Sequence, residues 1–129
     1  METIIKPIID KELLESLEHL VSEEKQVIVH CLMPASPFWG NLVRIWPSTV
    51  LEDKNSGHQS QLVHAENISY SPLWTEIEPM QDFWFTLVFT GLPKNCTHFN
   101  LHEIIPESGG FFVPNIKRNS TDVYRIKIE

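Results

Sequence analysis

The chain has 129 residues, of which 42% are hydrophobic and 21% are charged, and its formal net charge is −7. This composition is close to the globular average, so it argues against a disordered chain, and the length suits one domain, residues 1–129. Because negative charge repels phosphate groups, a nucleic-acid partner is disfavoured.

The N-terminal segment, residues 1–25, allows two interpretations. Leu13, Leu17 and Leu20 recur at helical spacing after Asp10, which is a favourable N-cap residue. The same segment also fits two strands around the turn Ser-Glu-Glu-Lys. The β character of the rest of the chain favours this second interpretation. Whether residues 10–25 form a short helix or a strand packed on the domain is left open.

The sequence predicts neither secretion nor membrane insertion. The residues after Met1 lack a basic start followed by an apolar run, and nowhere do about 18 apolar residues follow one another. We therefore expect a soluble cytoplasmic protein, unless an upstream leader is missing.

The two cysteines, Cys31 and Cys96, are expected to be free thiols in a reducing compartment. Their separation, with Trp46 between them, also resembles the disulfide spacing of immunoglobulin domains. Cys96 lies in an expected turn, however, which does not suit that disulfide. Whether the two are ever paired is left open.

From residue 26 onward the pattern is that of short strands separated by turn residues. The expected strands lie within residues 26–33, 42–47, 49–70 (two strands around the turn DKNSG), 83–104 (two strands around the turn GLPKN), 111–116 and 122–129. Residues 33–41 and 71–81 are expected loops because they contain several prolines. The run at 26–33 is almost continuously apolar and predicts a central strand that is covered on both faces.

Side-chain alternation gives the strand faces. Within residues 83–89, every second residue is a large apolar one, which predicts that this face packs on the core and that Trp84 points away from it. The same alternation places Arg44 and Trp46 on the outer face of the strand at 42–47. Seven or eight such strands predict an all-β fold, a mainly antiparallel sandwich.

Four segments together resemble small immunoglobulin-like β-sandwich modules of bacteria. They are RIWPSTVLEDKNSG (44–57), LVHAENI (62–68), FTLVFTGLPKNCTHFNLHE (85–103) and GGFFVPNIKRN (109–119). In those modules a strand similar to FTLxFxxLP leads through a turn into a strand similar to FDxxE. The resemblance covers about residues 42–128 and implies an immunoglobulin-like sandwich that acts as an accessory domain beside other domains, often in envelope proteins. It implies no catalytic motif, and Asn100 stands where those modules usually have an acidic residue.

The stretch CTHFNLHE, residues 96–103, combines potential metal ligands. On a strand, His98 and His102 are about 13 Å apart, whereas two ligands of one zinc ion are about 3 to 4 Å apart. We therefore expect ordinary solvent-side strand residues and no metal. A site completed by neighbouring strands, using His58 and His64, is an alternative.

Outward-facing tryptophans are the best indication of a binding surface. An exposed Trp beside Arg, His and Asn suits a sugar ring or the side chain of a partner. The predicted surface comprises Arg44, Trp46, Trp84, His98, Asn100 and His102, with Trp39 and Trp74 at its rim. These rings could instead cap the edges of the sandwich or cover the N-terminal segment.

The sequence thus predicts a non-catalytic binding or protein-interaction module without a cofactor. The expected partner is another protein or a small ligand, and the oligomeric state is not predicted. One alternative is carbohydrate or small-ligand binding through the same tryptophans. Another is a metal-dependent enzyme built from His58, His64, His98 and His102.

Overall fold

The computed structural model describes residues 25–36, 42–106 and 109–128. Its strands are β1 (Val27–Met33), β2 (Leu42–Val43), β3 (Val50–Asp53), β4 (His58–Glu66), β5 (Thr75–Glu76), β6 (Phe83–Phe89), β7 (His98–His102), β8 (Phe112–Lys117) and β9 (Val123–Lys127). Within these ranges there is no helix of the length and apolar character that crossing a membrane requires. The N-terminal segment, for which the sequence allows either a helix or a strand, lies outside the described residues apart from Lys25. Trp39 also lies outside them.

Seven strands form one sheet in the order β8-β7-β3-β4-β6-β1-β9, and β2 pairs separately with β5. The all-β prediction is confirmed, with most strands where the sequence placed them. The expected strand at 42–47 is shorter, because only two residues pair with β5, and Ile45 forms an isolated bridge to Tyr70. The strands pair mainly antiparallel, as predicted, and the exception among the described strands is the parallel pair of β1 and β9. The first and last of the described strands can pair in parallel because no short turn has to join them.

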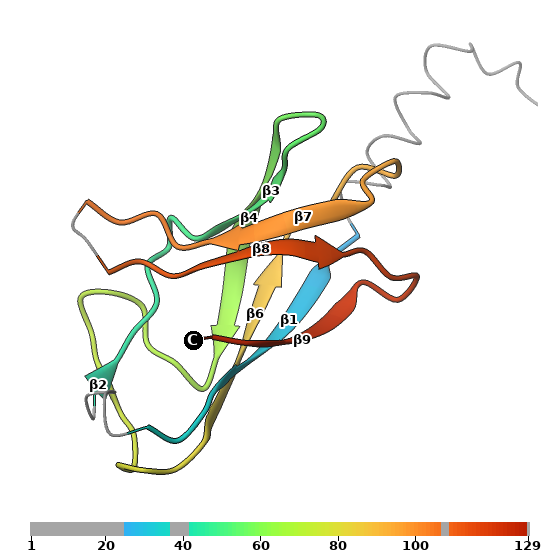
Figure 1. The fold of residues 1–129 in the computed structure, drawn as a ribbon. Coiled ribbons are helices and arrows are strands. Elements are labelled where there is room, and N and C mark those ends of the chain that lie inside the picture. The colour runs from blue at the N-terminus through green and yellow to red at the C-terminus, as the bar shows by residue number, and fades with distance from the viewer. Residues whose placement is uncertain (1–24, 37–41, 107–108, 129) are drawn as a thin grey trace, which may run out of the picture.

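The large sheet folds back on itself so that its two ends face each other. Four strands separate β7 from β9 in the sheet order. Nevertheless, the rings of Phe99 on β7 and Tyr124 on β9 are 4.9 Å apart, edge to face. Figure 1 shows β7 and β8 running across the upper ends of β6 and β1. The bend runs through the long strand β4, whose register shifts between Leu62 and His64, as a strand that bends commonly does.

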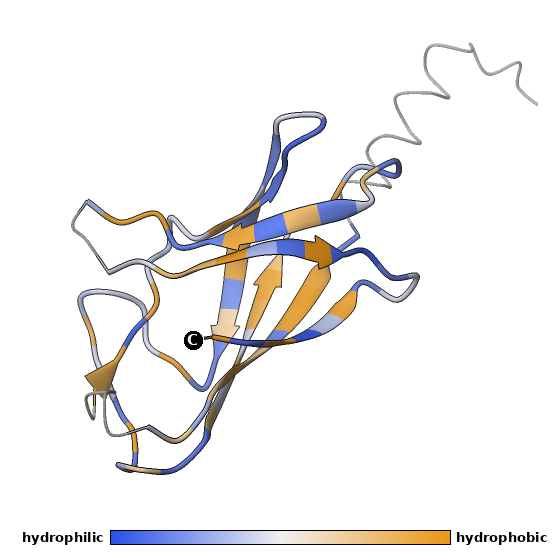
Figure 2. Ribbon diagram, in the orientation of Figure 1, coloured by the Kyte–Doolittle hydropathy of each residue, from blue (hydrophilic) through white to orange (hydrophobic). Residues whose placement is uncertain are grey.

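The inner faces of the two layers enclose the core. The predicted alternation in β6 is confirmed, because Phe85, Leu87 and Phe89 are buried while Trp84 is 48% exposed. Figure 2 shows apolar residues concentrated along β6 and β1. The prediction that β1 is covered on both faces is wrong for the described residues: its second face, which includes His30, is only half-buried. The reason is that the second described layer packs on one face of this strand alone.

The β3–β4 hairpin uses its polar residues for its own turn. The Asp53 carboxylate accepts hydrogen bonds from the Asn55 amide (3.2 Å) and from the Ser56 hydroxyl (2.7 Å). Gly57 has a φ of +77°, a backbone conformation that residues other than glycine rarely adopt. Its amide donates a hydrogen bond to the Asp53 carbonyl at 2.8 Å. The expectation of a hairpin turn at DKNSG is confirmed.

Arg118 fixes the end of the sandwich at which the β6–β7 and β8–β9 turns meet. Its guanidinium donates to both oxygens of Asp122 at 3.0 Å and to the main-chain carbonyl of Pro93. The hydroxyl of Tyr124 donates to the same carboxylate at 2.9 Å. Burial and the neighbouring carboxylate raise the pKa of Tyr124 to about 12.

Both cysteines are buried and unpaired in this structure, as expected for free thiols. Cys31 lies on β1 in the core, and its burial raises the pKa of the thiol. Cys96 lies in the turn before β7, where burial also raises the thiol pKa. A buried thiol with a raised pKa behaves as a small apolar side chain rather than as a nucleophile.

We predict that Arg118→Ala lowers the free energy of unfolding by about 3 kcal/mol at pH 7, because it leaves the buried Asp122 carboxylate unpaired. Although burial alone would raise it, the hydrogen bonds from Arg118 and Tyr124 lower the pKa of Asp122 below its usual value. The carboxylate therefore contributes its stability above the unfolded-state pKa of about 3.9 and loses it as the pH falls below that value. Urea unfolding at pH 7 and near pH 2.5 should show a smaller effect of the substitution in acid.

Arg125→Ala is the matched control, because Arg125 is exposed on β9. We expect it to change stability by less than about 0.5 kcal/mol at either pH. Equal effects of the two substitutions would contradict a special role for Arg118.

Candidate functional site

The structure places the predicted contact residues in three separate regions. Arg44, Trp46 and Trp74 come together beside one pocket. The side chains of His98, Asn100 and His102 belong to the outer face of β7. Trp84 lies on the outer face of β6, opposite Leu32 of β1. The residues therefore do not form one continuous surface, and Trp39 lies outside the described residues.

Arg44 lies over both tryptophan rings of the first group. The carbon at the centre of its guanidinium is 3.9 Å from the ring centroid of Trp74 and 5.5 Å from that of Trp46. One guanidinium nitrogen also donates to the Pro72 carbonyl at 3.3 Å. Contacts of this type contribute about 0.5 to 1 kcal/mol each at exposed sites. The sequence prediction that Arg44 and Trp46 share the face opposite to Val43 and Ile45 is confirmed, since the latter two are buried.

The adjoining pocket has a volume of about 440 Å³. This lies within the range of about 300 to 1,000 Å³ that is usual for ligand pockets. Its wall combines the ends of several strands with the β2 segment and is mainly apolar: Met33, Val43, Ile68, Phe85, Phe111 and Ile128 contribute to it. Polar groups come from Arg44 at the rim and from Glu103. We refer to it as the Trp46–Trp74 pocket.

Glu103 supplies a carboxylate to the wall of this pocket. The residue is only 8% exposed, and its Oε2 accepts a hydrogen bond from the main-chain amide of Trp46 at 3.3 Å. Burial raises the pKa of this carboxyl, and hydrogen bonds from the main chain of Trp46 and Phe111, with the charge of Arg44, offset part of the increase. A carboxylate with a perturbed pKa in an otherwise apolar pocket is a typical feature of binding sites.

Gly110 is required next to Glu103 because the two main-chain segments are closely packed. The Glu103 amide donates to the Phe111 carbonyl at 2.9 Å. A Cβ atom at Gly110 would overlap the Glu103 carbonyl oxygen. Glycine at this position therefore allows the segment before β8 to lie against the end of β7 and to complete the pocket wall.

The chemistry of the Trp46–Trp74 pocket suits an apolar group that carries a hydrogen-bond donor. The wall can bury an aromatic or aliphatic group, and the Glu103 carboxylate can accept a hydrogen bond from it. In the sequence, Glu103 stands out only as one of the potential metal ligands at 96–103. The alternation of Phe99 and Leu101, both buried, already indicated that Glu103 faces inward.

On the outer face of β7, the structure corrects one expectation. Asn100 was predicted to be a solvent-side residue, but it is 2% exposed. His98 is exposed, and the half-buried His102 has its Nδ1 3.4 Å from a carboxylate oxygen of Glu52 and its ring edge to face with Phe112. Asn100 is covered because β8 bulges opposite it, which strand alternation does not reveal.

The four histidines of the metal-enzyme alternative have different partners. His58 contacts Ser60 and the Gly91 carbonyl, each at 3.1 Å, and His64 lies 2.5 Å from Glu66. Across the part of the chain that the structure describes, no three His, Cys, Asp or Glu side chains are arranged to hold a metal ion. No geometric observation therefore favours this alternative.

We predict that Glu103→Gln leaves the protein at least as stable as the wild type at pH 7. The raised pKa means that the charged carboxyl is disfavoured in the folded state. The carboxyl therefore destabilises the fold above its folded-state pKa, and this effect vanishes below the unfolded-state value of about 4.3. Urea unfolding should show that any advantage of glutamine shrinks as the pH falls toward 4. A large loss of stability at pH 7 would instead identify the carboxylate as a structural group.

Comparisons of the chain with protein-family models, with curated proteins and with solved structures gave no match.

Proposed function

We propose that the chain is a non-catalytic binding module that holds an aromatic side chain of a partner protein in the Trp46–Trp74 pocket. The observation that carries this proposal is a pocket of about 440 Å³ with apolar walls, the exposed ring of Trp74 beside the half-buried Trp46, and one buried carboxylate. Tryptophan and arginine are the residue types that dominate the energetics of protein interfaces.

Exposed apolar residues near the pocket favour a protein over a small ligand. Leu42 is 46% exposed, Leu73 is 68% exposed and Trp74 is 52% exposed, and all three lie in or beside the β2–β5 ribbon. A small ligand inside the pocket would leave these side chains in water. A protein surface could cover them together with the pocket, which buries more apolar area.

Glu103 favours a tryptophan or tyrosine as the inserted side chain. Each has an apolar ring for the pocket wall and one polar hydrogen, which needs an acceptor when it is buried. The carboxylate oxygen of Glu103 offers that acceptor. A purely aliphatic group would leave the charged carboxylate buried without a new partner, which is unfavourable.

The resemblance to bacterial accessory modules supports the same proposal. Immunoglobulin-like modules of that kind contribute contacts rather than reactions to the proteins that contain them. The seven-stranded sheet is compatible with such a module.

We predict that Trp74→Ala lowers the free energy of unfolding by less than about 1 kcal/mol, because half of the ring is in water. Phe89→Ala provides the comparison, since Phe89 is fully buried on β6. That substitution should cost about 3 to 5 kcal/mol. Urea unfolding measures both. A cost for Trp74→Ala close to that for Phe89→Ala would show that the ring belongs to the core and not to a contact surface.

Photo-crosslinking tests the binding itself. With p-benzoylphenylalanine in place of Leu73, irradiation in a native lysate should yield a discrete adduct with one protein. The adduct should disappear when Trp74→Ala is added. The matched control is the same photo-reactive residue in place of Met80, which is 61% exposed but, unlike Leu73 beside Trp74, adjoins no residue of the pocket wall. Equal labelling from both positions, or an adduct that survives Trp74→Ala, would contradict the proposal.

A further inference from the structure

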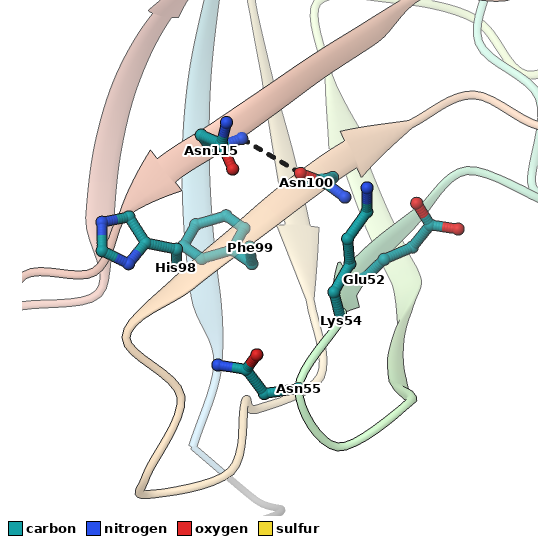
Figure 3. Close-up of a pocket in the computed structure, with 7 residues that line it drawn as sticks. All are labelled: Glu52, Lys54, Asn55, His98, Phe99, Asn100 and Asn115. Atoms are coloured by element: carbon teal, nitrogen blue, oxygen red, sulfur yellow. Dashed lines mark hydrogen bonds between the residues drawn. The ribbon is translucent and has the colours of Figure 1, made fainter.

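A second pocket of about 560 Å³ lies on the outer face of β3, β7 and β8. Figure 3 shows its side chains: Glu52, Lys54, Asn55, His98, Phe99, Asn100 and Asn115. No lining residue is shared with the Trp46–Trp74 pocket. We refer to it as the Asn100 pocket.

The side-chain amide of Asn100 is held in one orientation. The residue is 2% exposed, and its Oδ1 accepts a hydrogen bond from the main-chain amide of Asn115 at 3.0 Å. Exchanging the oxygen and the nitrogen would set two donors against each other. The Nδ2 group is therefore identified as the atom on the other side, and it has no hydrogen-bond partner among the described residues.

A bulge in β8 explains the hydrogen bond that Asn100 Oδ1 accepts. Phe99 is paired with Ile116 and Leu101 with Val113, so that Pro114 and Asn115 both lie opposite Asn100. The Asn115 main-chain amide finds its acceptor in the Asn100 side chain. The bulge does not explain why Asn100 Nδ2 is buried without a hydrogen-bond partner. Such burial lowers the stability of the fold by about 1 to 3 kcal/mol. A donor kept at that cost points to an acceptor that is supplied from outside.

The charged groups of the pocket limit what this acceptor can be. Lys54 is exposed and has no ion-pair partner among the described residues, so its ammonium is available. Glu52 is part-buried, with 24% of its side chain exposed, and its one described contact is His102 at 3.4 Å. The wall therefore carries one carboxylate and one ammonium, and this balance favours neither an anionic nor a cationic ligand. A hydroxyl group can accept from the ammonium and the amide and can donate to the carboxylate.

We propose that the Asn100 pocket binds a neutral sugar, with one ring hydroxyl accepting a hydrogen bond from Asn100 Nδ2. Neighbouring hydroxyls of the same ring reach Lys54 and Glu52, which border the amide in Figure 3. The Lys54 side chain is exposed, so it can move aside when the ligand approaches the buried amide. The site is separate from the proposed partner pocket, and either can fail without the other.

The test is a titration of the ¹⁵N-labelled protein with glucose, galactose and N-acetylglucosamine, followed by NMR. At least one sugar should shift the Asn100 side-chain amide signals and the main-chain signals of Lys54 and Asn115 in a saturable way. Asn100→Asp removes the donor while keeping the acceptor for Asn115, and it should weaken binding at least tenfold. Asn95→Asp introduces the same charge at an exposed turn position and should leave the affinity unchanged.

Lys54→Met provides a second variant in case Asn100→Asp does not fold, because Lys54 is exposed and its replacement leaves the core intact. It should also weaken sugar binding. The inference is overturned if no sugar shifts the Asn100 signals, or if Lys54→Met and Asn95→Asp have equal effects. It is also overturned if acetate or phosphate, but no sugar, binds at this pocket. Loss of the Leu73 crosslink would leave these measurements unaffected.

Discussion

The ion pair between Arg118 and Asp122 holds together the end of the sandwich where its two layers meet. Because both layers belong to one bent sheet, the core closes only when β7 comes to lie against β9. Arg118 joins the carbonyl of Pro93, in the turn before β7, to the carboxylate of Asp122, in the turn before β9. Tyr124 donates to the same carboxylate, which places its ring against Phe99. The Trp46–Trp74 pocket lies at the other ends of these strands, beside Glu103 and Ile128, so its shape depends on this closure.

The two pockets differ in chemistry and suit two different kinds of ligand group. The Trp46–Trp74 pocket is lined by core residues and carries one carboxylate with a raised pKa, which suits an aromatic side chain that has a polar hydrogen. The Asn100 pocket lies on the outer face and is lined by amides and by charges of both signs, which suits hydroxyl groups. In each pocket one buried polar group is kept at a cost in stability: the Glu103 carboxylate in the first and Asn100 Nδ2 in the second. Such costs are more readily explained by binding than by folding.

Strand alternation allowed much of the fold to be predicted from the sequence. It predicted that Trp84 faces outward and Phe85 faces the core, and that Arg44 and Trp46 share one face. Each of these orientations depends only on the alternation of side chains within a single strand. The burial of Asn100 could not be predicted in this way, since it depends on a bulge in a different strand. The separation of Trp84 from Trp46 and Trp74 follows from the sheet order, which single-strand patterns do not contain. The role of Glu103 could have been inferred from the alternation of Phe99 and Leu101, but its place in a pocket required the neighbouring strands.

An NMR titration of the ¹⁵N-labelled protein with indole tests directly whether the Trp46–Trp74 pocket holds an aromatic side chain. Indole combines an apolar ring with one N–H donor, as the proposed partner side chain does. We expect saturable shifts of the indole N–H signals of Trp46 and Trp74 and of the main-chain signals of Glu103 and Gly110, with the Trp84 signal unchanged. Shifts that are absent from these groups, or that are equally large at Trp84, would contradict the assignment of the Trp46–Trp74 pocket as the binding site.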